Sequence, residues 1–260
     1  MRLAPLDWLL APAPTKARVA WLRGVTYAHR GLHGDAVVEN SPGAFARAIA
    51  AGLGIECDVQ LSSDGMAMVF HDRALDRLTS ARGPVADRTA ADLKQIALGL
   101  SGETIPALAD LLHQIAGRAP LLIELKSFGD GAAPPLCSAV AEALAGYQGD
   151  HAVMSFDPRV SRWFARHSRE TVRGLVVTES GGRGWRSKIG RQRALWQARP
   201  DFLAYDVSDL RSAFANAQRR RGLPLLTWTV RSAFQVERAL RRADGYIVEA
   251  EGVATAAAKP

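Results

Sequence analysis

Histidine, arginine and carboxylate side chains gather at the ends of two short apolar stretches in the first third of the chain. The stretch VTYA runs into His29 and Arg30, and the stretch LGI runs into Glu56 and Asp58. Buried barrel strands show this pattern when their C-terminal ends open onto an active site. The sequence therefore indicates an enzyme whose reactive groups lie at strand ends.

Residues 55–72 are predicted to form a hairpin that brings two carboxylates and an imidazole together. Alternation along a strand places Glu56 and Asp58 on the same side. The Ser-Asp-Gly sequence at 63–65 favours a turn. If the chain folds back between Asp64 and Gly65, the residue numbers of two paired positions add up to about 129. This pairing would place His71 opposite Asp58.

Three carboxylates, those of Glu56, Asp58 and Glu124, each lie near the end of a predicted strand. On one barrel rim they would repel one another unless a ligand neutralised them. We expect them to hold a hard divalent cation, Mg²⁺ or Ca²⁺, with Mn²⁺ as a further candidate. The alternative is three separate ion pairs with neighbouring Arg or Lys side chains.

Two histidines at strand ends, His29 and His71, would flank such a cation as general acid and base, because imidazole titrates near neutral pH. A single buried histidine is usually structural, but two beside carboxylates favour catalysis. Arg30 and Lys126 supply the positive charge that a phosphodiester requires, Arg as a planar fork and Lys as a point charge.

The elements that must position these groups alternate strictly between strand and helix. Strands that precede helices are predicted to begin near 25, 54, 121, 152, 173, 202, 224 and 245. Eight such units predict an α/β fold, the (β/α)8 TIM barrel, which usually takes roughly 250 residues. A doubly wound open sheet is the alternative, but GLHGDAVVENS after the first strand is not the GxGxxG loop expected there. The first helix is predicted from Pro42 to Ala51, with Ser41 as its cap.

A single domain is expected over 1–260, with an insertion at about 61–104 and an N-terminal extension at 1–23. Within the insertion, a helical stretch is predicted near 90–97. The segment LDWLLAP in the extension is predicted to form a helix or strap that closes the bottom of the barrel, or else to rest on a membrane surface. No stretch approaches about 20 uninterrupted apolar residues, so we expect no transmembrane segment and a cytoplasmic protein.

The net charge of +7 and the pI near 9.9 favour an anionic substrate or partner. A phosphorylated small molecule or lipid head group fits better than nucleic acid, because the aromatic residues do not interleave with Arg and no nucleic-acid-binding motif is present. The basic stretch at 183–193 is predicted to be a loop that leads into a helix near 188–198. It would either contact anionic head groups at a membrane surface or remain solvated.

At these residues the chain resembles the glycerophosphodiester phosphodiesterase family. The matching motifs, in family order, are HRG at 29–31, ENS at 39–41, IECDVQLSSDG from 55, VFHD at 69–72, LIELK around Glu124, MSF at 154–156 and TWTV around Trp228. Two positions depart from the family pattern, since Arg231 stands where relatives often have Asn and Glu249 where they often have Asp. Both are expected on the rim, on the leaving-group side.

The resemblance implies a TIM barrel with a small insertion after the second strand, and metal-dependent hydrolysis of glycerophosphodiesters to an alcohol and sn-glycerol 3-phosphate. The nucleophile would be water or the substrate's own hydroxyl, through a cyclic phosphate. The implied roles are acid and base for His29 and His71, phosphate contact for Arg30 and Lys126, metal ligation for Glu56, Asp58 and Glu124, and lining of the glycerol or acyl side for Trp228. The alternatives are a phospholipase D-like activity on lysophospholipids and a catalytically silent binding barrel, which would ordinarily have lost a His or a carboxylate.

Overall fold

The strands of the described chain form one sheet in the order β1-β9-β8-β7-β6-β5-β4-β2-β3, and β1 also pairs with β2. Eight parallel strands joined in this order have the topology of the predicted (β/α)8 barrel. The remaining strand, β3, is the antiparallel partner of β2. The computed structural model describes residues 4–34, 36–129, 131–182 and 184–257. It divides into two compact units, Tyr27–His151 and Met1–Thr26 with Ala152–Pro260.

The unit 27–151 contains both predicted catalytic histidines and all three predicted metal ligands. Strand β2 (Gly54–Leu61) pairs in parallel with β1 (Thr26–Ala28) and β4 (Leu121–Leu125), and antiparallel with β3 (Ala67–Val69). The helices are α3 (Pro42–Ala50), η2 (Leu75–Arg77), η3 (Val85–Asp87), α4 (Ala90–Leu93), α5 (Leu108–Ile115) and α6 (Ala133–Ala143).

Helix α3 has almost the bounds predicted from its local signals. Ser41 Oγ accepts a hydrogen bond from the backbone N–H of Ala44 at 3.2 Å, and Pro42 opens the helix. Its last helical residue is Ala50, and Gly52 follows with a φ of 67°. Glycine adopts this left-handed conformation without the steric cost of a Cβ, and it ends the helix.

The hairpin between β2 and β3 has a register one residue away from the predicted one. Val59 pairs with Val69, so paired positions sum to 128. The predicted sum of about 129 was wrong, because three residues rather than two form the loop at 63–65. His71 therefore lies beyond the end of β3 and is not the strand partner of Asp58.

The segment between β3 and α5 has a hydrophobic core of its own. The buried residues of this core are Met68, Phe70, Leu75, Val85, Ala90, Leu93, Leu98, Ile105 and Ala107. The helix predicted near 90–97 is shorter, ending at Leu93. Because η2 is anchored in this core through Leu75, the core determines where the neighbouring Arg77 lies.

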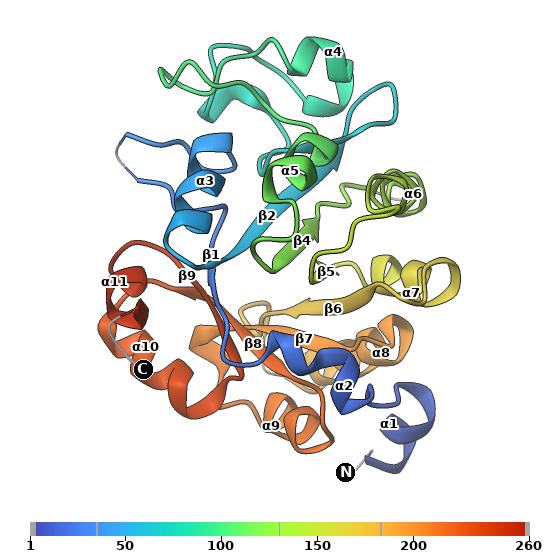
Figure 1. Cartoon of the computed structure of the whole chain (residues 1–260). Coiled ribbons are helices and arrows are strands. Elements are labelled where there is room, and N and C mark those ends of the chain that lie inside the picture. The colour runs from blue at the N-terminus through green and yellow to red at the C-terminus, as the bar shows by residue number, and fades with distance from the viewer. Residues whose placement is uncertain (1–3, 35, 130, 183, 258–260) are drawn as a thin grey trace. The chain divides into compact units, whose positions relative to one another are not determined.

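The second unit contains five of the parallel barrel strands (Figure 1). These strands are β5 (His151–Ser155), β6 (Val172–Val177), β7 (Phe202–Asp206), β8 (Leu225–Val230) and β9 (Gly245–Val248), where His151 itself falls in the first unit. Its helices are α1 (Ala4–Leu10), α2 (Lys16–Val19), η1 (Ala20–Leu22), α7 (Pro158–His167), α8 (Trp185–Ala198), η4 (Val207–Asp209), α9 (Ala213–Arg220), α10 (Ala233–Arg242) and α11 (Glu251–Ala257).

Helix α8 begins at Trp185, before the predicted start at 188. The described part of the basic stretch is therefore mainly helical, and the expectation of a loop was wrong there. Trp185 is 67% exposed in the first turn. Arg183 lies outside the described residues.

The N-terminal segment packs on its unit through a buried carboxylate. Asp7 of α1 accepts hydrogen bonds from Gln192 and Trp196 of α8 and from Gln218 of α9. The segment is helical and packs on α8 and α9, whereas closure of the barrel bottom by it stays a prediction. None of the described helices has the length and apolar character needed to cross a bilayer.

Candidate active site

The three carboxylates that the sequence predicted to meet do lie together. Asp58 on β2 pairs with Glu124 on β4, and Glu56 points to the same side of β2 as Asp58. One carboxylate oxygen from each residue lies within 4.8 Å of the other two. The three residues are buried, with exposed fractions of 1%, 1% and 8% for Glu56, Asp58 and Glu124.

Two cationic side chains contact this cluster. Lys126 Nζ lies 3.0 Å from Asp58 Oδ1 and 2.6 Å from Glu124 Oε1. Arg30 Nε lies 3.2 Å from Asp58 Oδ2, and the Arg30 backbone N–H donates to Glu56 Oε2 at 3.0 Å. The ion pairs considered as an alternative therefore exist, but three buried carboxylates share two cations. The remaining negative charge would be balanced by a proton on one carboxyl group or by a bound cation.

The pKa values of two neighbouring carboxyl groups move in opposite directions. Burial raises the pKa of Glu56 well above its usual value, and the charges of Asp58 and Glu124 add to this effect. Burial alone would also raise the pKa of Asp58, but Lys126 and Arg30 outweigh it and hold the pKa at about 2. Three buried carboxyl groups whose oxygen atoms lie close together provide hard donors that fit Mg²⁺, Ca²⁺ or Mn²⁺.

The conformation of the turn after β1 explains why a glycine follows His29 and Arg30. Arg30 has a φ of 54° and Gly31 a φ of 77°. A Cβ on Gly31 would lie 2.8 Å from the Cβ of Ala44, so only glycine fits. The turn aims the Arg30 backbone N–H at Glu56, while the guanidinium reaches Glu39 at 2.7 Å.

Asn40 belongs to this site, although the sequence analysis assigned it no role. Its Nδ2 donates to Asp58 Oδ2 at 3.0 Å, and its Oδ1 accepts from the Asp58 backbone N–H at 3.3 Å. Its φ of 56° lies in the left-handed region, which Asn tolerates better than most residues. Asn40 is the middle residue of the ENS motif at 39–41. From the sequence, only Ser41 of this motif could be given a local role, as the cap of the following helix.

His71 is oriented by a chain of charged side chains that sequence reasoning also missed. Its Nδ1 lies 2.7 Å from Asp72 Oδ1, and Arg77 Nε donates to Asp72 Oδ2 at 2.6 Å. Arg77 also donates to Glu39 Oε1 at 2.7 Å. Burial lowers the pKa of His71 below its usual value, and the carboxylates of Asp58 and Asp72 only partly oppose this. The neutral imidazole is therefore favoured.

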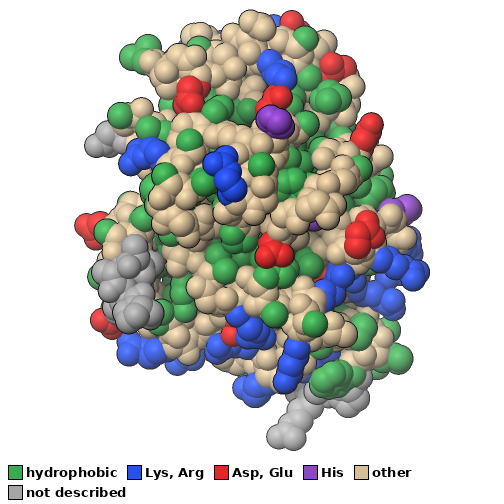
Figure 2. Space-filling view, viewed as in Figure 1, with side chains coloured by type: hydrophobic (Ala, Val, Ile, Leu, Met, Phe, Trp, Pro, Cys, Tyr) green, Lys and Arg blue, Asp and Glu red, His purple; other side chains and the backbone are tan. Residues whose placement is uncertain are grey.

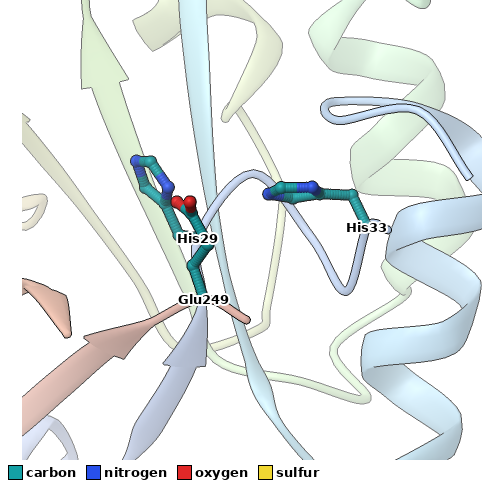
Figure 3. A group of neighbouring side chains, drawn as sticks. All are labelled: His29, His33 and Glu249. Carbon is teal, nitrogen blue, oxygen red and sulfur yellow. The ribbon is translucent and has the colours of Figure 1, made fainter. Parts of the chain in front are cut away.

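His29 follows β1 directly, as predicted. Figure 3 shows its imidazole at the end of that strand and the imidazole of His33 further along the same loop. Both residues are half-buried. His29 precedes Arg30 in the chain and belongs to the same compact unit as Glu56 and Asp58.

Trp228 belongs to the other unit, where it lies on β8. Its Nε1 donates to the carbonyl of Ala204 at 3.0 Å, and its ring packs edge-to-face on Phe156 with centroids 5.5 Å apart. The same unit contains Arg231 and Glu249, the two residues that depart from the family pattern. They form an ion pair, in which Arg231 Nε lies 3.0 Å from Glu249 Oε1. Figure 3 also draws Glu249.

Comparisons with known sequences identify one family. The model of the "Glycerophosphoryl diester phosphodiesterase family" matches residues 29–253. A glycerophosphodiester phosphodiesterase of Caldanaerobacter subterraneus subsp. tengcongensis is 39% identical over 114 residues, which cover 41% of this chain and 46% of that protein. The chain spans about half the length of the curated relatives it matches.

Solved structures have the same fold. An Oleispira antarctica phosphodiesterase in complex with the product sn-glycerol-3-phosphate matches with a TM-score of 0.77 and 23% identity, over 92% of this chain and 98% of that one. A glycerophosphodiester phosphodiesterase from Thermotoga maritima matches with a TM-score of 0.69 and 25% identity, over 86% and 94%. With the family model covering most of its length, the chain belongs to the glycerophosphoryl diester phosphodiesterase family.

Proposed function

We propose that this chain hydrolyses glycerophosphodiesters to an alcohol and sn-glycerol 3-phosphate with the help of a divalent cation. The observation that carries the proposal is the buried cluster of Glu56, Asp58 and Glu124 in contact with Arg30 and Lys126, in a chain of this family. A phosphodiester is an anion, and its hydrolysis builds up negative charge on oxygen. Both the cationic side chains and a cation held by the carboxylates oppose that charge.

The three carboxylates are the proposed ligands of the cation. When bound, a hard divalent cation supplies a Lewis acid for the phosphoryl oxygens. Lys126 and Arg30 lie within hydrogen-bond distance of the same carboxylates, so both stand where a phosphate bound at this cluster would meet them. Trp228 is proposed to line the glycerol or acyl side of the substrate site.

We assign the base to His71 and the acid to His29. The contact of His71 Nδ1 with Asp72 fits a tautomer that donates from Nδ1, which leaves Nε2 free to accept a proton. The lowered pKa of His71 supports the same role, because a base must be neutral before it acts. His29 then protonates the departing alkoxide. The nucleophile is water or the glycerol hydroxyl of the substrate, and detection of a cyclic phosphate would identify the second route.

The decisive experiment compares substrates and metals. Purified protein treated with EDTA is assayed with glycerophosphocholine, glycerophosphoethanolamine and lysophosphatidylcholine, before and after addition of Mg²⁺, Ca²⁺ or Mn²⁺. We expect sn-glycerol 3-phosphate from the two water-soluble substrates, only after a cation is restored. Turnover confined to lysophosphatidylcholine would favour the phospholipase D-like alternative. Absence of turnover with every substrate would favour a silent binding barrel. The cytoplasmic location expected from the sequence stays a prediction.

A further inference from the structure

Five arginine side chains line a groove between α9 and α10, in the unit that does not contain the carboxylate cluster. The groove has a volume of about 330 Å³. Its arginines are Arg211, Arg219, Arg238, Arg241 and Arg242. Figure 2 shows Lys and Arg side chains gathered where Figure 1 places these two helices. The proposed catalysis uses none of them.

Helical spacing explains why the groove is continuous. Phe234, Arg238 and Arg241 follow one another at intervals of four and three residues on α10, so they lie along one face of the helix. Arg242 borders the same face, and Arg211 lies ahead of α9 on the opposite wall. Groups that donate hydrogen bonds therefore line both walls.

Nearby carboxylates neutralise only part of this charge. Arg219 is paired with Asp244 at 2.9 Å, and Arg241 is paired with Glu237 at 3.2 Å. Among the described residues, no carboxylate is paired with the other three arginines of the groove. Five guanidinium groups thus face two carboxylates, and the groove carries an excess of positive charge that an anion would relieve.

One aromatic side chain borders the groove. Phe234 is 68% exposed, and the guanidinium carbon of Arg238 lies 5.1 Å from its ring centroid. This cation–π contact holds both side chains against the groove. A single aromatic ring does not provide the successive stacking platforms that single-stranded nucleic acids need. The groove therefore favours a compact anion over a nucleic-acid strand.

We propose that the α9–α10 groove binds phosphate groups, carried either by a soluble phosphorylated compound or by a phospholipid head group. Guanidinium groups match phosphate because their planar fork donates two parallel hydrogen bonds to its oxygens. The volume of the groove is at the small end of the range for ligand sites, so it fits one or two phosphate groups. Binding here is separate from hydrolysis and does not depend on the proposed activity.

The test removes two groove arginines that lack a carboxylate partner. Pyrophosphate binding is measured by titration calorimetry, and lipid binding by cosedimentation with phosphatidylcholine vesicles that contain or lack phosphatidylglycerol. The variant Arg211→Gln/Arg242→Gln is compared with Arg47→Gln/Arg166→Gln, which loses the same charge at exposed positions on α3 and α7. Both variants keep the carboxylate cluster intact, so phosphate binding there cancels in the comparison.

We expect the groove variant to bind at least about tenfold more weakly than the control, because it loses two guanidinium groups that donate charge-assisted hydrogen bonds to phosphate oxygens. A loss seen only with pyrophosphate identifies a soluble ligand, and a loss seen only with phosphatidylglycerol vesicles identifies a lipid head group. Equal binding by the two Gln double variants with both probes would overturn the proposal. Equal thermal midpoints would verify folding, and Arg211→Lys/Arg242→Lys should bind with intermediate affinity, because it keeps the charge without the fork.

Discussion

The side-chain amide of Asn40 bridges the backbone and the carboxylate of Asp58, donating to Oδ2 at 3.0 Å and accepting from the backbone N–H at 3.3 Å. Asp58 is buried and also contacts Arg30 and Lys126. Asn40 therefore orients a carboxylate that we propose as a metal ligand. Groups that orient ligands in this way commonly affect metal affinity about 10- to 100-fold.

We expect Asn40→Gly to weaken binding of the divalent cation by about 10- to 100-fold. Glycine is the substitution of choice because it accepts the left-handed backbone at this position, where alanine would add strain. Titration calorimetry with the cation after EDTA treatment measures the effect. Gln148→Ala, at an exposed amide in the same unit, is the control. Unchanged affinity in Asn40→Gly would show that Asp58 needs no such support.

Local signals in the sequence were sufficient for the strands, the helix cap at Ser41 and the carboxylate cluster. The cap at Ser41 depends on a contact with a residue three positions away, and a sequence pattern records such contacts. Glu56 and Asp58 share a face because side chains on a strand alternate, and Glu124 joins them because parallel strands end on the same rim. These inferences need no knowledge of distant packing.

Contacts between distant residues were not predictable in the same way. Arg77 contacts Glu39 across 38 positions, and the separate core of the insertion sets that contact. No periodic pattern encodes such a pairing. The register of the hairpin carrying His71 was wrong by one residue, because the length of a loop containing Gly65 depends on geometry that the Ser-Asp-Gly sequence does not determine.

His29→Ala and His71→Ala are each expected to lower kcat for glycerophosphocholine by about 100-fold or more, because each removes a proton-transfer group. The fold should survive, since both residues are only half-buried. His113→Ala, at an exposed position on α5, controls for loss of an imidazole. Steady-state kinetics and thermal midpoints are measured together. Wild-type rates in either catalytic variant would remove that histidine from the mechanism.

The pH profile of kcat/KM reports the protonation of His71. Its pKa is lowered by burial, so its neutral form persists below the usual pKa of about 6.5 and the acidic limb should lie below that pH. The hydrogen bond to Asp72 raises this pKa, so Asp72→Asn should move the limb to still lower pH and reduce the rate. Asp87→Asn, at an exposed carboxylate of the insertion, should leave the limb in place. A limb that moves upward in Asp72→Asn would contradict this assignment.

Cation binding should release a proton wherever the pH lies below the raised pKa of Glu56. Without a cation, burial and the neighbouring charges raise this pKa, so the carboxyl group keeps its proton to a higher pH than an ordinary Glu, and ligation must expel that proton. Affinity should therefore increase with pH, and calorimetric enthalpies should depend on the ionisation enthalpy of the buffer. Glu56→Gln should bind the cation more weakly and show a smaller dependence, of which the part that remains comes from Glu124, whose pKa is also raised by burial. The matched control is Glu142→Gln, exposed on α6, for which wild-type behaviour is expected.

Gly31→Ala should destabilise the turn that aims Arg30 at the carboxylates. The φ of 77° at Gly31 would cost a residue with a Cβ about 1–2 kcal/mol of unfolding free energy. The new Cβ would also lie 2.8 Å from the Cβ of Ala44, and this overpacking would cost about 1–3 kcal/mol more. Gly52→Ala separates the two costs, because its φ is 67° and its Cβ would meet nothing within 4 Å. Urea unfolding of both variants should show the larger loss of unfolding free energy for Gly31→Ala, together with a fall in kcat that Gly52→Ala does not share. Equal losses in the two variants would mean that the contact with Ala44 relaxes and that backbone strain alone requires glycine in the His-Arg-Gly turn.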